Sequence, residues 1–358
     1  MGFEPRLEAF RVAPKAFMGF IPVCGALLLA ALPLYGCAPW AALACAIAAL
    51  GLLVGELVLY RELIDPLFRH ATSHNLVATA PPRGAVKRIL LVGGHCDSAF
   101  EWRYHFLGRG LLYGVVGGTL LGAVALSVAA VASVAVHGAG GAPPGSGLWR
   151  VGWGLLAFAP AFLLVMGFSN FRRVSPGAND NLTGVLLSLA LLRFLRDHNI
   201  QLEHTELRVL NTGSEEAGLR GARAYAETHR DELLAVPSLY VALDTFSDPG
   251  AMKVYDKDRN GTVSHDPASA RLLRDAARRA GFELPFGTIR VGATDAAAFS
   301  RAGLRAVALV AMDPAPPRWY HTRLDTPDRL SPECIEAGLR VVIELVRTVD
   351  TGAGFESA

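Results

Sequence analysis

Acidic and imidazole side chains follow several short apolar runs in this sequence, at spacings that suit metal binding. The apolar run at residues 89–92 leads through two glycines to His95 and Asp97. Alternate residues of a strand point the same way, so these two side chains would share a face. Such a pair is either a chance feature of the surface or a metal ligand with its supporting carboxylate. The other polar clusters decide between these two readings.

Two clusters lie next to predicted helices. Asp180 lies in SPGANDNLTGV (175–185), just before a helical pattern, and Glu215 and Glu216 follow a predicted strand in NTGSEEAGLRG (211–221). Each has an ordinary alternative explanation. Asp180 would cap the helix, and the two glutamates would be solvated acids that favour a helix start.

Two more clusters complete the set. Asp244 closes a predicted strand, and a proline-rich loop holds Tyr320, His321 and Asp325. Together the clusters supply two imidazoles, two aspartates and a glutamate pair, which suits Zn²⁺ or a similar divalent ion. Two-metal hydrolases bridge ions about 3.5–4 Å apart with one carboxylate, and a spare glutamate beside a ligand would act as general base.

Alternating strand and helix patterns must position these side chains. Strands are expected at residues 75–78, 88–92, 207–210, 239–243, 252–255, 288–291 and 306–310. Helices are expected at residues 181–197, 217–230, 267–280, 295–302 and 332–348. This alternation predicts an α/β fold with a mainly parallel, mixed sheet flanked by helices. Ligands gather at the carboxyl ends of such strands, where the polar clusters lie.

Four apolar segments reach the length of about 20 residues that crosses the hydrocarbon layer. They cover about residues 16–35, 40–60, 111–136 and 148–168 and form two hairpins. The first segment is too long for a signal-peptide core and leads directly into the second, so we do not expect it to be cleaved. The loops inside the hairpins hold no Lys or Arg, whereas basic residues flank the outer ends. The positive-inside rule therefore places both termini in the cytoplasm, with Arg150 as the one exception.

These patterns predict a multi-pass membrane protein with three parts. The parts are an amino-terminal transmembrane hairpin at residues 1–69, a catalytic domain at 70–110 and 169–358 that faces the cytoplasm, and an inserted hairpin at 111–168. The net charge of +2 gives no reason to expect nucleic-acid binding. The five cysteines are scattered and predict no disulfide framework.

The motifs, in their order, resemble those of the zinc exopeptidases of metallopeptidase family twenty-eight. The matching stretches are HCD (95–97), GANDN (177–181), SEEAGLRGARAY (214–225), ALDTFSD (242–248), GATDAAAFSRAGLRAV (292–307) and YHTRLDTPD (320–328). The resemblance covers about residues 73–348 apart from the inserted hairpin, which typical relatives replace with a short loop. It implies a peptide substrate and two Zn²⁺ ions that activate the attacking water.

The resemblance also implies roles by matched position. His95 and Asp244 would hold one zinc ion, Glu216 and His321 the other, and Asp180 would bridge them. The remaining residues would assist: Glu215 as general base, Asp97 as hydrogen-bond acceptor for His95, Tyr320 as the group that polarises the scissile carbonyl, and Asp325 as a support for His321.

Several alternatives remain open. A glutaminyl-cyclase-like acyl transfer would use one zinc ion, and a non-catalytic receptor or scaffold would not need an intact Glu215. A transporter fits poorly, because the four spans contain only Glu56 as an acid. The stretch DKDRNGTVSHDP (256–267) imitates a calcium loop, but Pro267 stands where a bidentate Glu is needed, which favours an Asn-Gly turn. The sequence predicts neither the oligomeric state nor which peptide end is trimmed.

Overall fold

The chain forms two compact units in the structure, a computed structural model that describes residues 3–289, 291–313 and 316–352. The first unit comprises Met1–Pro14, His70–Ala99 and Ser175–Ala358. The second comprises Lys15–Arg69 and Phe100–Val174. Both units are therefore assembled from segments that lie far apart in the sequence.

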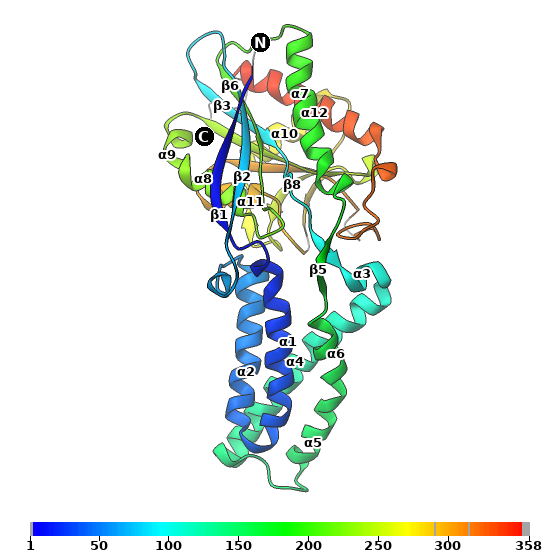
Figure 1. The fold of residues 1–358 in the computed structure, drawn as a ribbon. Coiled ribbons are helices and arrows are strands. Elements are labelled where there is room, and N and C mark those ends of the chain that lie inside the picture. Colours follow the sequence, from blue (N-terminus) through cyan, green and yellow to red (C-terminus); the bar gives the residue numbers. More distant parts are fainter. Residues whose placement is uncertain (1–2, 290, 314–315, 353–358) are drawn as a thin grey trace. The chain divides into compact units, whose positions relative to one another are not determined.

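A mixed sheet is the centre of the first unit (Figure 1). Its strands run in the order β1-β2-β6-β3-β7-β11-β8-β10, with β9 beside β8. Their bounds are β1 Glu4–Val12, β2 Ala71–Ala80, β3 Arg88–Gly93, β6 Thr205–Asn211, β7 Ser238–Phe246, β8 Lys253–Asp258, β9 Val263–Ser264, β10 Phe286–Thr288 and β11 Ala306–Ala311. Strands β6, β3, β7 and β11 are parallel, so their carboxyl ends meet at one edge.

Helices cover both faces of this sheet. One face packs against α7 (Thr183–Asp197), α10 (Pro267–Arg279) and α12 (Pro332–Asp350), and the other against α8 (Arg220–Thr228) and α11 (Ala296–Arg301). The two faces alternate along β7, because Leu239 belongs to the first core whereas the ring of Tyr240 stacks on Phe299 of α11 at 4.1 Å. The predicted α/β fold with helices on a mixed sheet is confirmed.

Sequence patterns located most elements of this unit within a few residues. Strand β3 is buried at every position, as expected for a central strand covered on both faces. The strand expected at residues 288–291 includes residue 290, which lies outside the described residues, and β10 ends at Thr288. Strand β1 was not predicted; it pairs antiparallel with β2, from Glu4 opposite Thr79 to Val12 opposite Ala71.

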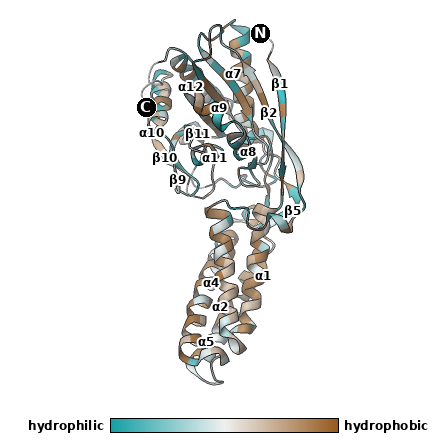
Figure 2. Ribbon diagram, turned by 90° about the vertical axis from the view of Figure 1, so that its left-hand side faces the viewer, coloured by the Kyte–Doolittle hydropathy of each residue, from teal (hydrophilic) through white to brown (hydrophobic). Residues whose placement is uncertain are grey.

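The second unit is dominated by apolar helices. Its elements are α1 Ala16–Cys37, α2 Pro39–Leu52, a π-helical turn at Leu53–Val58, β4 Phe100–Trp102, α3 Arg103–Leu107, α4 Arg109–His137, α5 Gly147–Leu155, α6 Ala159–Val165 and β5 Ser169–Val174. Figure 2 shows that α1, α2 and α4 are hydrophobic over most of their length. Four stretches are long and apolar enough to cross a membrane: Ala16–Cys37, Pro39–Val58, Arg109–Gly140 and Gly147–Val165.

Two local features shape these helices. A 3₁₀ turn at Leu156–Phe158 divides the fourth stretch, and it precedes Pro160, which lacks the N–H that a continuous helix needs. Glu56 is fully buried, and its Oε1 accepts hydrogen bonds from the backbone N–H groups of Leu63 (2.8 Å) and Ile64 (3.1 Å). Glu56, the one acid of the four stretches, thus has a local structural role. This role gives no support to a transport path.

Candidate metal site

A cavity at the carboxyl edge of the central strands brings the predicted side chains together. His95 follows β3 and forms an isolated bridge with Thr212, which follows β6. The glycine at 93 is required because a Cβ there would lie 1.7 Å from the carbonyl oxygen of Leu210. The cavity is lined by seven of the nine predicted site residues: His95, Asp180, Glu215, Glu216, Asp244, Tyr320 and His321.

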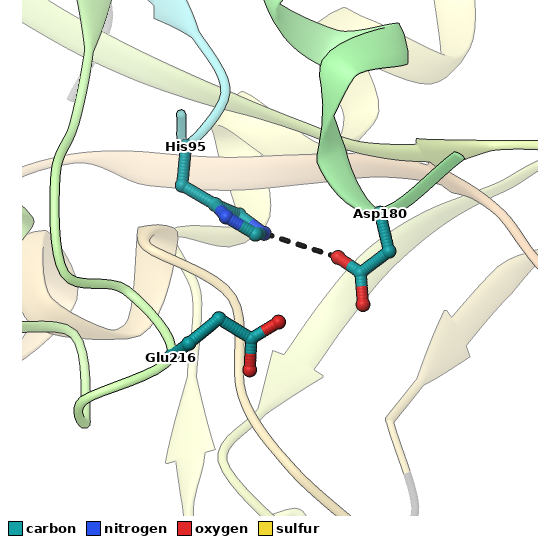
Figure 3. A group of neighbouring side chains, drawn as sticks. All are labelled: His95, Asp180 and Glu216. Carbon is teal, nitrogen blue, oxygen red and sulfur yellow. Dashed lines mark ion pairs between the residues drawn. The ribbon is translucent and has the colours of Figure 1, made fainter. Parts of the chain in front are cut away.

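Asp180 lies between the two imidazoles. Its Oδ1 lies 3.2 Å from Nε2 of His95, and its Oδ2 lies 3.0 Å from Nε2 of His321. All three side chains are at most 9% exposed. Figure 3 shows His95, Asp180 and Glu216 converging from three different segments, and one ligand atom of each lies within 4.8 Å of the others. This spacing suits side chains that share a metal site.

The two adjacent glutamates face different imidazoles. Oε1 of Glu216 lies 3.2 Å from Nε2 of His321, whereas Oε2 of Glu215 lies 3.9 Å from Nε2 of His95. The segment that carries them begins at Ser214, a non-glycine residue with a φ of 58°. Strained backbone of this kind persists where surrounding contacts hold it, as is common at functional sites.

Asp97 supports both His95 and the glutamate pair. His95 Nδ1 lies 3.2 Å from the backbone oxygen of Asp97 and 3.6 Å from its Oδ1. The carboxylate of Asp97 also accepts the backbone N–H of Glu215 at 2.9 Å and of Glu216 at 3.1 Å. An imidazole that donates its Nδ1–H in this way presents Nε2 to a metal ion.

Asp325 holds the loop of Asp180 rather than His321. Its carboxylate accepts the backbone N–H groups of Asn179 (2.9 Å) and Asp180 (3.0 Å) and the side-chain amide of Asn179. The expected support of His321 by Asp325 is therefore wrong: the turn between them directs Asp325 toward the amino end of the helix, where N–H groups need acceptors.

Asp244 and Tyr320 complete the predicted set. Asp244 Oδ1 accepts a hydrogen bond of 2.7 Å from the hydroxyl of Thr245, the residue after it at the end of β7. The ring of Tyr320 stacks on that of His321 with centroids 3.8 Å apart. Burial raises the pKa of Tyr320 well above its usual range, so its hydroxyl remains a hydrogen-bond donor.

Burial and the close approach of several carboxylates shift the pKa values of the side chains that line the cavity. Burial raises the pKa of Glu215 well above its usual range, and the carboxylate of Glu216 adds to the rise. Burial and the charge of Asp180 raise the pKa of Asp244 to about 7. Although burial opposes it, the charge of Glu216 and the hydrogen bond to Asp180 raise the pKa of His321 to about 10. These shifts are those of a site with too few positive charges for its carboxylates.

Sequence reasoning did not identify Asp295 as part of the site. This residue is 3% exposed, its carboxylate accepts a hydrogen bond from the hydroxyl of Thr212, and burial raises its pKa to about 6. It lies beside Glu215, whose pKa its charge raises further. Its only sequence signal was its position in GATDAAAF, where it was expected to begin a helix.

The segment at residues 256–267, which resembles a calcium loop in sequence, has a structural role. Asp258 is fully buried, and it accepts hydrogen bonds from the backbone N–H of Thr294 at 3.0 Å and from the backbone N–H of Arg259. Nε2 of His265 lies 3.2 Å from its other oxygen. The carboxylate is thus occupied by protein donors, and residues 259–261 form a turn with positive φ.

Comparisons with known proteins show what the chain is similar to. The model of "Peptidase family M28" matches residues 160–346, just over half of the chain. "Aminopeptidase YwaD" of Bacillus subtilis (strain 168) is 28% identical over 167 residues, which are 45% of this chain and 35% of that protein. The structure of an aminopeptidase from Aneurinibacillus sp. strain AM-1 has a TM-score of 0.50 and 22% identity, and the match covers 78% of this chain and 48% of that one.

A zinc aminopeptidase from Bacillus subtilis matches with a TM-score of 0.49 and 20% identity, over 79% of this chain and 51% of that chain. This chain therefore spans about half or less of the length of these three proteins. The family prediction from the ordered motifs is confirmed. By the extent of the family match, the chain belongs to peptidase family M28.

Proposed function

We propose that this chain is a membrane-bound aminopeptidase that works with two zinc ions. The observation that carries the proposal is the position of Asp180, with one carboxylate oxygen 3.2 Å from His95 and the other 3.0 Å from His321. A bridging ligand of a two-metal hydrolase requires this arrangement. Family membership and the aminopeptidase relative support peptides as substrates.

The ligand set fits zinc. His95 and Asp244 would hold one ion, Glu216 and His321 the other, with Asp180 between them. Glu216 Oε1 is buried and accepts no hydrogen bond from the residues that the structure describes, as expected of a ligand atom. When bound, the ions would polarise the substrate carbonyl and make the attacking water more acidic.

Glu215 would handle the protons. Its carboxylate reaches the cavity but lies farther from the imidazoles than its neighbour Glu216 does, which leaves it available to a water molecule. Burial raises its pKa, so its carboxylate is a stronger base than that of an exposed glutamate. Glu215 then takes a proton from the attacking water and returns it to the leaving amine.

Tyr320 and Asp97 would assist from opposite sides. The hydroxyl of Tyr320 would donate a hydrogen bond to the oxygen of the scissile carbonyl as negative charge develops there. Asp97 fixes the backbone of the glutamate pair and the ring of His95, so it would act by positioning.

Part of the cavity lining is apolar and is called the apolar wall here. The cavity is also lined by Tyr255, Ile289, Ala293, Val310 and Met312. A charged substrate side chain would lose its hydration against these residues without gaining a partner. The wall therefore favours peptides with an apolar residue at the cleaved end.

The apolar helices would place the enzyme in a lipid bilayer. Four stretches have the length and composition of membrane spans, and we propose that they cross as two hairpins, at residues 1–69 and 111–168. The exposed basic residues Lys15, Arg69, Arg103 and Arg172 flank them, which supports a cytoplasmic catalytic domain by the positive-inside rule.

Metal analysis and a substrate panel test the function. The full chain, purified in detergent, should contain two zinc ions and release the first residue of free peptides, but not of peptides with a blocked amino end. A chelator should abolish this activity and zinc should restore it. One zinc ion per chain and no released amino acid would instead favour glutaminyl-cyclase-like acyl transfer, and no turnover of any kind would favour a scaffold.

A further inference from the structure

The chain passes between the two units at Pro14, His70, Ala99 and Ser175 of the first unit. These positions are called departure points here, and they lie at the sheet edge that carries the site. Strand β2 is antiparallel to β6, with Leu76 opposite Asn211, the last residue of β6. The earlier residues of β2 therefore extend past the carboxyl end of β6. The pair Val12–Ala71, where the first apolar segment departs and returns, lies at this end of the sheet.

Contacts tie the first departure point to the glutamate pair. The hydroxyl of Ser73, two residues after Ala71, accepts a 2.8 Å hydrogen bond from the hydroxyl of Ser214, which directly precedes Glu215. Helix α1 starts at Ala16, four positions after Val12. Four extended residues reach at most about 14 Å. The first apolar helix is thus connected by a very short tether to a strand that touches the site.

The second departure point is tied to the other side of the site. The backbone N–H of Ser175 donates to the carbonyl of Ala99 at 2.8 Å, which brings the two ends of the inserted segment together. The hydroxyl of Ser175 donates to the carbonyl of Thr322 at 2.9 Å. Thr322 directly follows His321, so this insertion also begins and ends beside a site residue.

The chain near these departure points has the composition of a membrane interface. Exposed basic residues lie there, at Arg11, Lys15, Arg69, Arg103, Arg172 and Arg173. Leu63 and Leu67 are 54% and 74% exposed. Basic side chains attract anionic headgroups, and exposed leucines gain from burial in the boundary between headgroups and acyl chains.

We propose that the site acts on peptides held at a lipid surface, namely chains whose carboxyl end is anchored in the bilayer and whose free amino end lies close to the headgroups. This inference rests on the proposed function and on the apolar helices crossing the bilayer. It adds the substrate class: the short link from Val12 to Ala16 holds this edge of the sheet within about 14 Å of the start of α1, so a peptide that extends only a few residues from the lipid could reach the site.

A series of lipid-anchored peptides tests this proposal. The full chain is reconstituted with zinc into vesicles that contain anionic lipid, and one cleavable amino-terminal sequence is offered in three forms. These are the free peptide, a form joined to a double-acyl anchor by about 4 Gly/Ser residues, and a form with about 30, whose r.m.s. reaches are roughly 11 and 30 Å. An amino-terminally blocked copy of each form controls for other hydrolysis.

The short-spacer peptide should be cleaved with a kcat/KM about tenfold or more above that of the free peptide, and at least as fast as the long-spacer form, because a nearby site gains most from the shorter tether. Faster cleavage of the long-spacer peptide, or of the free peptide, than of the short-spacer peptide would overturn the proposal. Failure to cleave any of the three forms would instead contradict the proposed peptidase function, so the two ideas fail separately.

Discussion

Nε2 of His95 lies 3.2 Å from Oδ1 of Asp180, although these residues are 85 positions apart and much of that interval belongs to the second unit. The other oxygen of Asp180 faces His321. The sheet makes this possible, because His95 leaves the carboxyl end of β3 while Asp325 anchors the loop of Asp180 through its backbone N–H groups. The account of function depends on this one carboxylate.

Replacing the proposed base separates proton transfer from metal binding. Glu215→Gln keeps the shape and the backbone contacts to Asp97 but cannot take a proton. We expect kcat to fall by about 10²- to 10⁴-fold with zinc content unchanged. Initial-rate kinetics and elemental analysis measure both quantities, and near-normal hydrolysis would refute the assignment.

Replacing Asp180, the proposed bridging ligand, should lower both zinc binding and turnover. Asp180→Asn loses the negative charge shared by two ions, so bound zinc and turnover should fall together. Asp197→Asn, on the exposed end of α7, is the matched control and should leave both unchanged. If Asp180→Asn retained two zinc ions per chain, another residue would have to be the bridge.

Asp97 should act through its neighbours. Asp97→Asn weakens the support of His95 and of the glutamate backbone, so zinc affinity should fall by about 10- to 100-fold. Excess zinc should then restore much of the activity, which would not happen for Glu215→Gln. Competition with a chelator of known affinity provides the measurement, and unchanged zinc affinity would contradict the positioning role.

The metal-free protein should lose stability as pH rises. The folded-state pKa of Asp244, about 7, exceeds its ordinary value of 3.8, so the folded state binds more protons than the unfolded state between these pH values. The pKa of His321, about 10, exceeds its ordinary value of 6.5. The contribution of His321 to the stability of the folded state is therefore lost as the pH rises between these two values. The chelated protein should therefore melt at a lower temperature at pH 8 than at pH 6, and zinc should raise Tm more at pH 8. The opposite order for the rise in Tm would show that Asp244 and His321 are not zinc ligands.

The apolar wall sets the preference at the cleaved end. Peptides that begin with Leu or Met should show a kcat/KM about tenfold or more above those that begin with Asp. Met312→Lys places a cation on this wall and should narrow the difference. A panel of aminoacyl amides measures the ratio, and an equal rate for Asp and Leu would show that the wall does not contact the substrate side chain.

The sequence was most informative where residue type and chain order both matter. Strands such as β3 are buried at every position and mostly apolar, and the polar residues after them lie at the sheet edge where the topology brings them together. The ordered motifs therefore predicted seven side chains that line one cavity. Nδ1 of His95 lies 3.2 Å from the backbone oxygen of Asp97 and 3.6 Å from its Oδ1, and the support of His95 by the Asp97 carboxylate stays a prediction.

Features that depend on distant partners were missed. Strand β1 reads as a basic flank of α1, and only its pairing with β2 makes it part of the sheet. Asp295 has no local pattern, because its place beside Glu215 depends on where α11 packs. Asp325 was assigned to the nearby His321, whereas its partners, Asn179 and Asp180, lie about 145 positions away in the chain.

Anomalous scattering at the zinc absorption edge, from crystals of the full chain, tests the central claim most directly. The account predicts two peaks about 3.5–4 Å apart, one on each side of the Asp180 carboxylate, with His95 and His321 bound to different ions. A single peak, or peaks that do not contact Asp180, would contradict the two-zinc site.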